Sequence, residues 1–266
     1  MFGADSAGGV LGLKAYTVAA GRARFHVLLY AAASGELLAF IEADRLGQLR
    51  TGAASGVATR YLARPDASVA AVFGAGNQAR TQVEAVARVR DLTEIRVYSR
   101  SEERRNAFCA EMSGRTGLWI VPTTSPEAAL AGAHIVTTIT TSTRPVFDGS
   151  LLEPGMHLNV AGSNSLLKQE VDEATITRAD LLAVDCLAAV PLEAGDLLAP
   201  LQKGTLYPEA LVELGRIVAG RHTGRTTPEQ VTLFKSHGAP LEDIALATKA
   251  YARAVERGVG APLGPQ

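Results

Sequence analysis

Apolar and polar positions follow two different patterns along the chain, and the first of them covers most of its length. From about residue 66 to residue 239, short apolar runs bounded by turn residues alternate with longer amphipathic stretches. Such an alternation is typical of buried strands separated by helices, and it predicts a parallel sheet. The predicted strands are residues 69–73, 95–98, 118–121, 134–139, 157–161 and 181–184, and the clearest helices are residues 78–89 and 126–131.

The two ends of the chain show the second pattern. The N-terminal part reads as β-structure followed by a helix rich in small residues, and the last periodic stretch reads as one amphipathic helix. The turn Ser34-Gly35 joins two of the strands into a hairpin. The predicted elements are strands at residues 10–17, 25–30 and 37–41, and helices at residues 50–62 and 241–257.

One apolar strand runs directly into Gly74-Ala75-Gly76-Asn77-Gln78-Ala79, a Gly-x-Gly-x-x-Ala turn. A buried strand, a tight glycine turn and a helix start are what the diphosphate of a dinucleotide needs. Gly74 permits the turn, Gly76 lets the backbone approach the phosphates, and Ala79 lets helix and strand pack closely. Because the helix N-terminus presents free N–H groups to an anion, we expect Asn77 and Gln78 to contact the cofactor as well.

The next strand ends in Ser99-Arg100-Ser101, at the position where proteins that prefer NAD usually carry Asp or Glu on the ribose hydroxyls. A hydroxyl at Ser99 and a guanidinium at Arg100 suit a ribose phosphate better than a bare ribose. We therefore expect NADP(H) to be favoured, with NAD(H) as the alternative cofactor. The competing interpretation is that Arg100 is a solvated loop residue before a helix that starts near Ser101.

Ligands of open parallel sheets bind beyond the carboxyl ends of the strands. That rule brings Thr138 and the turn Gly162-Ser163 to the same rim as the glycine turn. The threonines of residues 137–143 have a competing explanation in ordinary strand preference. The predicted rim consists of residues 74–78, 99–101, 138–141 and 162–164.

Composition excludes several classes of function. The chain has 266 residues, of which 47% are hydrophobic and 20% charged, and its net charge of −1 offers no basic surface for nucleic acid. No apolar run reaches the length of a membrane span and the first residues lack a signal-peptide pattern, so we expect a cytoplasmic protein without membrane contacts. Two cysteines, Cys109 and Cys186, and five scattered histidines predict neither a disulfide framework nor a metal site.

Six short blocks follow one another along nearly the whole chain: residues 12–14, 49–55, 73–79, 155–163, 193–197 and 234–238. The block at 49–55 is similar to a Leu-Arg-Thr-x-Ala-x-Ser helix start, and the block at 73–79 to a Gly-Ala-Gly-x-Gln-Ala dinucleotide turn. In this order, the six blocks resemble the ornithine cyclodeaminase/mu-crystallin family.

The resemblance implies an α/β fold in which a Rossmann-type doubly wound parallel sheet, residues 66–239, is inserted in a smaller α+β domain. This smaller substrate and dimerisation domain would comprise residues 1–65 and 240–266. The family also implies a homodimer, and a hydride transfer between C4 of a nicotinamide and the α-carbon of a small amino or imino acid. Family members usually carry a further N-terminal helical stretch with a substrate-binding arginine, so this chain is expected to be N-terminally short.

Within that resemblance, Lys14 in a strand and Arg50 at a helix N-terminus are the candidate cations for the substrate carboxylate, and Lys14 is the candidate proton donor. Where the cyclodeaminases carry an aspartate as acid or base, this chain has Asn164, an amide that orients a nitrogen but exchanges no proton at neutral pH. Lys168 and His237 complete the candidate substrate contacts, and His237 is a second candidate proton donor. The candidate cofactor contacts are Gly74, Gly76, Asn77, Gln78, Ser99, Arg100, Thr138, Gly162, Ser163 and Ser236.

These features predict NAD(P)H-dependent reduction of a small cyclic or open imino acid (a ketimine) to the amino acid, or the reverse dehydrogenation. An ornithine cyclodeaminase, which releases ammonia and recycles its NAD, is the alternative. A further alternative is an inactive, mu-crystallin-like protein that binds NADP and a ligand. The competing interpretations of the site are solvated cations at Lys14 and Arg50, and a packed His237 with both ring nitrogens hydrogen-bonded.

Overall fold

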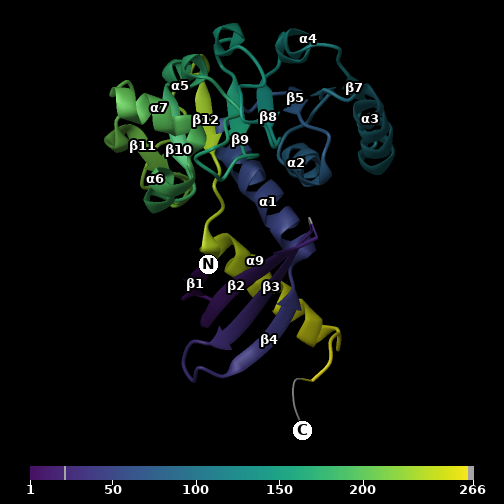
Figure 1. The fold of residues 1–266 in the computed structure, drawn as a ribbon, viewed down its shortest axis with the longest axis vertical. Helices are drawn as coiled ribbons and strands as arrows, with labels where there is room; N and C mark the ends of the chain where they lie inside the picture. The colour runs from purple at the N-terminus through teal and green to yellow at the C-terminus, as the bar shows by residue number, and fades with distance from the viewer. Residues whose placement is uncertain (21, 263–266) are drawn as a thin grey trace. The chain divides into compact units, whose positions relative to one another are not determined.

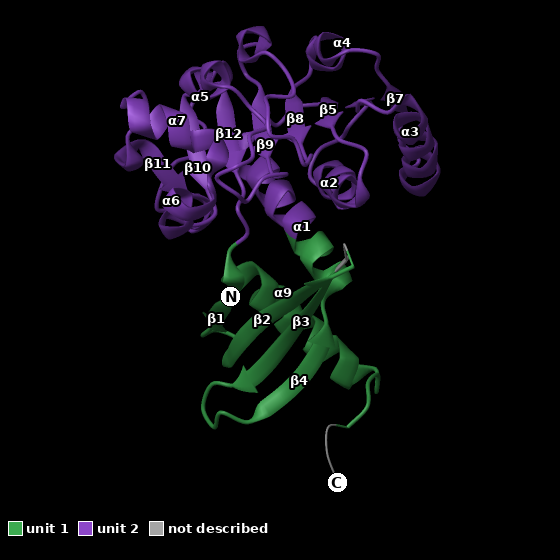
Figure 2. Cartoon of the chain, viewed as in Figure 1, with its two compact units in different colours: residues 1–50, 239–266 green, residues 51–238 purple. Residues whose placement is uncertain are grey.

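The computed structural model describes residues 1–20 and 22–262 (Figure 1). The chain divides into two compact units, which Figure 2 distinguishes by colour. Residues 1–50 with 239–266 form unit 1, and residues 51–238 form unit 2. The predicted segment 240–266 therefore ends, at residues 263–266, outside the described residues.

The boundary between the units lies inside the helix α1 (Asp44–Leu62), earlier than the boundary predicted after residue 65. The second half of α1 belongs to unit 2 because its apolar face is buried there: Ala54, Ala58 and Leu62 pack in one cluster with Phe234. The apolar spacing of a helix stays the same on both sides of such a boundary, so the local pattern does not reveal it.

Unit 2 is built on one sheet of eight strands: β5 (Val69–Phe73), β6 (Glu94–Tyr98), β7 (Ile120–Pro122), β8 (Ile135–Thr138), β9 (His157–Val160), β10 (Leu181–Val184), β11 (Leu211–Glu213) and β12 (Thr232–Lys235). All neighbouring strands pair in parallel. The six predicted strands are confirmed, and β5 and β10 have the predicted bounds. The strands β11 and β12 were not predicted; β12 contains two polar residues, Thr232 and the charged Lys235.

The strands of this sheet lie in the order β11-β10-β12-β9-β8-β5-β6-β7. The strands β6 and β7 follow β5 on one side, whereas β9 follows β8 on the other, so the direction of winding reverses between β5 and β8. The predicted doubly wound, Rossmann-type sheet is therefore confirmed. Ligands of such sheets bind beyond the carboxyl ends at the point of reversal, and the glycine turn after β5 lies there.

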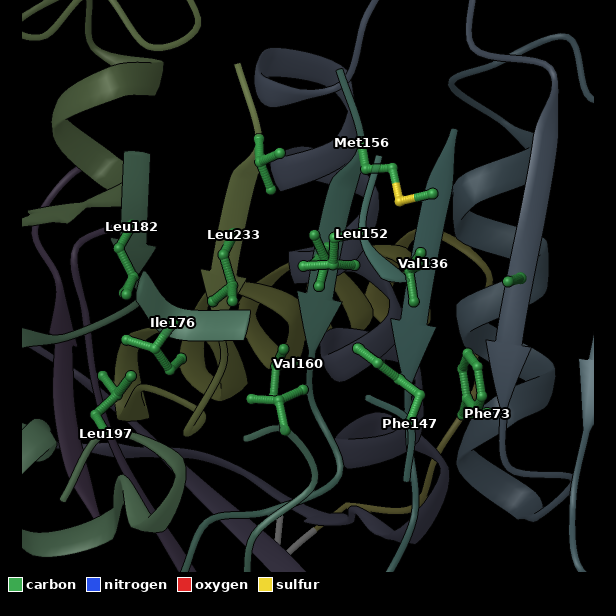
Figure 3. Packing of buried hydrophobic residues seen from close by; sticks show 14 of the residues in the cluster. Phe73, Val136, Phe147, Leu152, Met156, Val160, Ile176, Leu182, Leu197 and Leu233 are labelled. Atoms are coloured by element: carbon green, nitrogen blue, oxygen red, sulfur yellow. The ribbon is translucent and has the colours of Figure 1, made fainter. Parts of the chain in front are cut away.

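The helices of unit 2 are α2 (Asn77–Ala87), α3 (Glu102–Thr116), α4 (Pro126–Leu130), α5 (Glu173–Arg178), α6 (Val190–Glu193), α7 (Gly195–Lys203) and α8 (Leu214–Val218), with 3₁₀ turns at Gly149–Leu151, Leu187–Ala189 and Pro208–Ala210. Because successive residues of a strand face opposite sides, the sheet has two hydrophobic layers. In β5, Phe73 belongs to the cluster that Figure 3 draws across neighbouring strands. Val72 belongs to the other layer, where α2 and α3 pack. The sheet is therefore covered by apolar side chains on both faces.

Unit 1 contains an antiparallel sheet of four strands, β1 (Phe2–Asp5), β2 (Val10–Ala19), β3 (Arg22–Ala31) and β4 (Leu37–Glu42), and the helix α9 (Pro240–Glu256). The predicted hairpin and the predicted last helix are confirmed, whereas β1 was not predicted. The helix α9 packs on β1, β2 and β3 (Figure 1). Gly12 permits this approach, because a β-carbon there would collide with the side chain of Ile244. No helix among the described residues is long and apolar enough to cross a membrane.

Candidate active site

The glycine turn has the geometry that a diphosphate requires. Gly74 has a φ of +119°, and a β-carbon there would lie 2.5 Å from the carbonyl oxygen of Ile139, so only glycine fits. Gly76 caps α2 without a side-chain hydrogen bond, and a β-carbon at Gly76 would meet no atom of the described residues within 4 Å. The space around Gly76 at the start of α2 is therefore open, which suits an anion. Ala79 is fully buried.

Two alanine substitutions separate the fold of this turn from its binding role. Gly76→Ala is expected to leave the melting temperature unchanged, since the added methyl group meets no protein atom, and to weaken nicotinamide dinucleotide binding about tenfold or more by filling the space above the helix N-terminus. Gly74→Ala is expected to lower both the melting temperature and the affinity, because of its positive φ and the contact with Ile139. Thermal unfolding and fluorescence titration measure the two effects. Unchanged affinity in Gly76→Ala would remove this turn from the binding site.

The residues predicted to contact the adenosine ribose follow β6. The Ser99 hydroxyl donates to the carbonyl of Ser101, and the Ser99 carbonyl accepts a hydrogen bond of 2.7 Å from the guanidinium of the buried Arg105. Arg100 is exposed, as are Asn77 and Gln78 in the first turn of α2. Ser101 caps α3 by accepting the N–H of Arg104. The end of β6 therefore presents one exposed guanidinium and no carboxylate before the helix begins.

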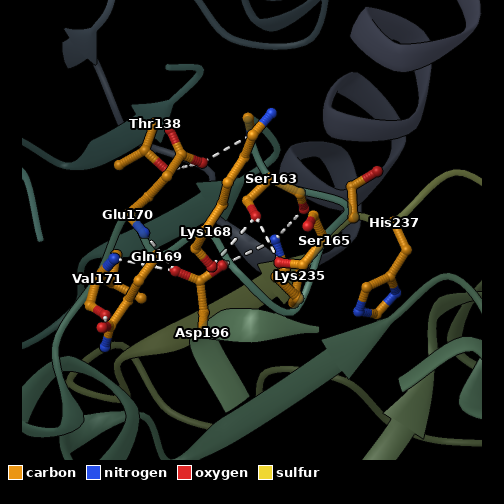
Figure 4. Close-up of polar contacts among 12 residues, drawn as sticks. Thr138, Ser163, Ser165, Lys168, Gln169, Glu170, Val171, Asp196, Lys235 and His237 are labelled. Carbon is orange, nitrogen blue, oxygen red and sulfur yellow. Dashed lines mark hydrogen bonds and ion pairs between the residues drawn. The ribbon is translucent and has the colours of Figure 1, made fainter. Parts of the chain in front are cut away.

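Three residues that were predicted to contact the cofactor take part in a network that holds the rim of the sheet together (Figure 4). Glu170 is fully buried and accepts hydrogen bonds from the Thr138 hydroxyl at 3.0 Å and from the N–H of Gly162 at 2.7 Å. Burial raises the pKa of the Glu170 carboxyl, although hydrogen bonds from Thr140 and the charge of Lys235 oppose this shift. The Ser163 hydroxyl donates to the carbonyls of Ser165 and Lys168.

A second buried carboxylate continues this network. Asp196 accepts the N–H groups of Glu170 and Val171, and its other oxygen lies 2.9 Å from the ammonium of Lys235. Lys235 also donates to the carbonyl of Ser163 at 2.6 Å. The side chains of Asp196 and Lys235 are both fully buried, so their charges neutralise each other inside the protein. The network fixes the loop of residues 162–170 beside the glycine turn.

The segment after β12 is wrapped around Asp185, a residue that no pattern had singled out. One carboxylate oxygen accepts the Ser236 hydroxyl and the N–H groups of His237 and Gly238; the other lies 2.8 Å from Nδ1 of His237. The predicted cofactor residue Ser236 thus donates to Asp185. Asp185 directly follows the predicted strand 181–184, so the rule that selected the rim would have found it.

In unit 1, the two candidate cations lie together on one carboxylate. The ammonium of Lys14 is 2.9 Å from Asp243, which is fully buried on α9, and Nε of Arg50 is 3.1 Å from the other oxygen of Asp243. Arg50 also pairs with Glu242 at 3.2 Å. Lys14 lies 5.2 Å from the centre of the Phe25 ring and is only 6% exposed, so neither cation is a freely solvated side chain.

The predicted placement of Arg50 at a helix N-terminus is wrong. The helix α1 already begins at Asp44, an acidic residue suited to a helix start, so Arg50 lies inside the helix without free backbone N–H groups beside it. Asp243 was missed in the sequence, although an aspartate between the apolar positions of helix 241–257 is a signal of a buried, paired carboxylate.

The last two candidates lie on the loop after β9. Asn164 is exposed, and its side chain makes no hydrogen bond to the described residues. Lys168 is half-buried and takes part in the network through its carbonyl. Both belong to unit 2, whereas Lys14 and Arg50 belong to unit 1.

A model of the ornithine cyclodeaminase/mu-crystallin family matches residues 7–258. The chain belongs to this family. A Bacillus cereus relative, Delta(1)-pyrroline-2-carboxylate reductase, is 39% identical over 228 residues, which cover 85% of this chain and 70% of the relative.

Two solved structures of the family are similar to this chain. The first is Thermococcus litoralis Delta(1)-pyrroline-2-carboxylate reductase in complex with NADH and L-proline; its TM-score is 0.92 at 35% identity, with 97% of this chain and 82% of that chain covered. The second is an archaeal alanine dehydrogenase dimer with bound NAD; its TM-score is 0.90 at 31% identity, with 96% and 81% covered. Both of these family members hold a nicotinamide cofactor.

Proposed function

We propose that this protein reduces a small cyclic or open imino acid to the amino acid with a nicotinamide cofactor, and that it catalyses the reverse dehydrogenation. The observation that carries the proposal is the similarity, over 85% of the chain, to a Delta(1)-pyrroline-2-carboxylate reductase. The open space around Gly76, at the start of α2, supports it, because a dinucleotide diphosphate binds at such a glycine turn.

The cluster in unit 1 suits the carboxylate of such a substrate. Asp243 is buried and holds Lys14 and Arg50 side by side, whereas the pair between Arg50 and Glu242 is partly exposed. Because this pair is the more exposed one, a substrate carboxylate that replaces Glu242 on the Arg50 guanidinium loses less free energy than one that replaces Asp243. The carboxylate then contacts both Lys14 and Arg50. This contact would orient the α-carbon for reaction. The bound nicotinamide supplies the hydride.

The assay that tests the function compares cofactor consumption with ammonia release. A reductase oxidises one equivalent of NADPH or NADH per molecule of Delta(1)-pyrroline-2-carboxylate. Ammonia release from ornithine without net cofactor change would instead identify a cyclodeaminase. The exposed amide of Asn164 favours the reductase, since it supplies no proton for ring closure. Cofactor binding without either reaction would support the inactive binding protein.

We further propose that NADP(H) is the preferred cofactor. The exposed guanidinium of Arg100 at the end of β6 supports this preference, because no carboxylate stands between β6 and α3 to hold a bare ribose. Arg100→Ala is expected to raise the Kd of NADPH about 10- to 100-fold, the loss of one charge-assisted contact, and to leave the Kd of NADH nearly unchanged. Fluorescence titration with both cofactors measures this. Tighter binding of NADH by the wild-type protein would contradict the proposal.

A homodimer through the sheet of unit 1 is the third part of the proposal. Phe2, Leu13, Leu28 and Phe40 lie directly opposite one another across the four strands, so their side chains share one face of the sheet. Phe2, Leu13 and Phe40 are 63%, 37% and 50% exposed, whereas α9 packs beside Gly12 on the other face. An apolar row across a whole sheet suits a second copy of the chain, and the archaeal relative is a dimer.

Phe40→Glu is expected to convert the dimer into monomers, because it places a charge in the middle of this apolar row. Sedimentation velocity of the wild-type protein and the variant measures the state. Trp119→Glu, at a 64% exposed aromatic residue of unit 2, is the control and is expected to remain dimeric. A wild-type monomer would contradict the proposed dimer.

A further inference from the structure

His237 is held by Asp185 in one defined orientation at the carboxyl edge of the parallel sheet. The strands β10 and β12 pair directly, and Asp185 and His237 follow them. One oxygen of Asp185 accepts the N–H groups of His237 and Gly238 at 2.7 and 2.6 Å, which fixes the backbone. The other oxygen lies 2.8 Å from Nδ1, which fixes the ring.

This contact determines where the ring carries its protons. Burial would raise the pKa of the Asp185 carboxyl, but the hydrogen bond and the charge interaction with His237, together with backbone N–H groups, lower that pKa. An ionised carboxylate only accepts hydrogen bonds, so Nδ1 must carry a proton. In the neutral ring, Nε2 therefore carries the lone pair. In the charged ring, Nε2 carries the second proton.

The nitrogen Nε2 is buried and has no hydrogen-bond partner among the residues that the structure describes. His157 is the opposite case: Nδ1 lies 3.0 Å from the Thr232 hydroxyl and Nε2 lies 3.2 Å from the Asn159 amide oxygen. Burial lowers the pKa of His157 to about 3, so that ring is neutral and structural. An unpaired buried ring nitrogen costs free energy, and a ligand that bonds to it recovers that cost.

We propose that His237 donates the proton to the imine nitrogen through Nε2, and that Asp185 is the residue that positions it. This inference rests on the proposed reduction of an imino acid. The Nε2–H bond breaks as the new N–H bond forms on the substrate, while the hydride supplied by the reduced nicotinamide goes to the carbon. The ring is left neutral, and it regains a proton from water. In the reverse direction, the Nε2 lone pair accepts the proton from the amino acid.

The surrounding charges are consistent with this role. Lys14 is paired with Asp243 in unit 1, which suits a cation that binds a carboxylate. Lys235, two residues before His237, is neutralised by Asp196 and binds the carbonyl of Ser163. Asp185 is the charged group in direct contact with the ring. The Asp185 carboxylate contacts the ring through Nδ1 and leaves Nε2 available.

Asp185→Asn is the sharpest test, because the amide oxygen keeps the backbone hydrogen bonds while the amide nitrogen faces Nδ1. The ring then carries its proton on Nε2 in the neutral form, and the imidazolium loses its counter-charge. We expect kcat for Delta(1)-pyrroline-2-carboxylate to fall about 10²- to 10⁴-fold in Asp185→Asn and in His237→Gln, with an unchanged Kd for the reduced cofactor. His222→Gln is the control: Nδ1 of that ring accepts the N–H of Gly224, outside the Asp185 contact, and wild-type kcat is expected.

A spectroscopic measurement decides the matter independently of turnover. In the wild-type protein with ¹⁵N-labelled histidine, the His237 signals are expected to show a proton on Nδ1, and the Nε2 signal is expected to shift when L-proline is added with NAD(P)⁺. In Asp185→Asn, the neutral ring is expected to carry its proton on Nε2. Wild-type kcat in either variant, or an Nε2 signal that does not shift when L-proline is added, would overturn the inference. A wild-type protein that reduces no imino acid would contradict the proposed function. The L-proline titration would then still show whether Nε2 of His237 contacts the ligand.

Discussion

Replacing Lys14 by methionine is expected to lower kcat/KM for imino-acid reduction by about 30- to 4,000-fold, the equivalent of about 2–5 kcal/mol for the loss of a hydrogen-bonded, largely buried cation. Methionine retains the apolar stem of the side chain but no charge. The Kd of the nicotinamide cofactor is expected to stay the same, since Lys14 belongs to unit 1 and the glycine turn to unit 2. Steady-state kinetics with Delta(1)-pyrroline-2-carboxylate and a fluorescence titration with NADPH measure the two quantities.

This variant also leaves the buried Asp243 with Arg50 as its remaining cationic partner among the described residues. Removing this counter-charge also destabilises unit 1, so a second variant separates lost stability from lost substrate binding. In Lys14→Met/Asp243→Asn both charges of the pair are gone, so stability is expected to recover in part while activity does not. Lys249→Met, at an exposed lysine of α9, is the control with wild-type kinetics. Wild-type kcat/KM in Lys14→Met would exclude Lys14 from the substrate site.

Lys235→Met is expected to lower the free energy of unfolding of unit 2 by about 3–5 kcal/mol, because it leaves the carboxylate of Asp196 buried without its counter-charge. The loss is expected to extend to the rim, since Asp196 also accepts the N–H groups of Glu170 and Val171. Urea unfolding followed by the fluorescence of Trp119, the single tryptophan of the chain, reports on unit 2.

The matched control for this substitution is Lys203→Met. Lys203 pairs with Glu173 at 2.5 Å, but its side chain is 60% exposed, so the loss of this surface pair is expected to change the free energy of unfolding by about 0–1 kcal/mol. The double variant Lys235→Met/Asp196→Asn is expected to be more stable than Lys235→Met alone. If Lys235→Met destabilised the protein no more than Lys203→Met, the buried pair would not be what holds the rim.

The features that could be predicted from the sequence are those that depend on neighbours in the chain. The strand 69–73 and the glycine turn after it follow from a short apolar run and two glycines, and the structure has both. The doubly wound sheet follows from the alternation of strands and helices. The parts that were missed depend on partners distant in the sequence: β12 carries a lysine that is tolerated only because Asp196 neutralises it, and the boundary inside α1 depends on packing against Phe234.

The candidate site shows the same division. The sequence marked Lys14, Arg50 and His237 as charged or polar residues in suitable places, but their actual partners, Asp243 and Asp185, stand in no motif with them. The pair of Lys14 and Asp243 joins residues 229 positions apart. Thr138 was selected by its place at the end of a strand, and that rule does not reveal that a buried glutamate accepts its hydroxyl.

The distance in sequence between Lys14 and Asp243 also sets the order in which the molecule is completed during synthesis. A ribosome adds about 5–20 residues per second, so α9 is synthesised about 10–45 s after β2. During this time the face of the unit 1 sheet that α9 later covers has no helix on it, and the ammonium of Lys14 lacks Asp243. Unit 2 is continuous and has all its residues earlier. Docking of α9 on this sheet therefore comes late in synthesis: it covers Gly12 with Ile244 and pairs Lys14 with Asp243 in the same event.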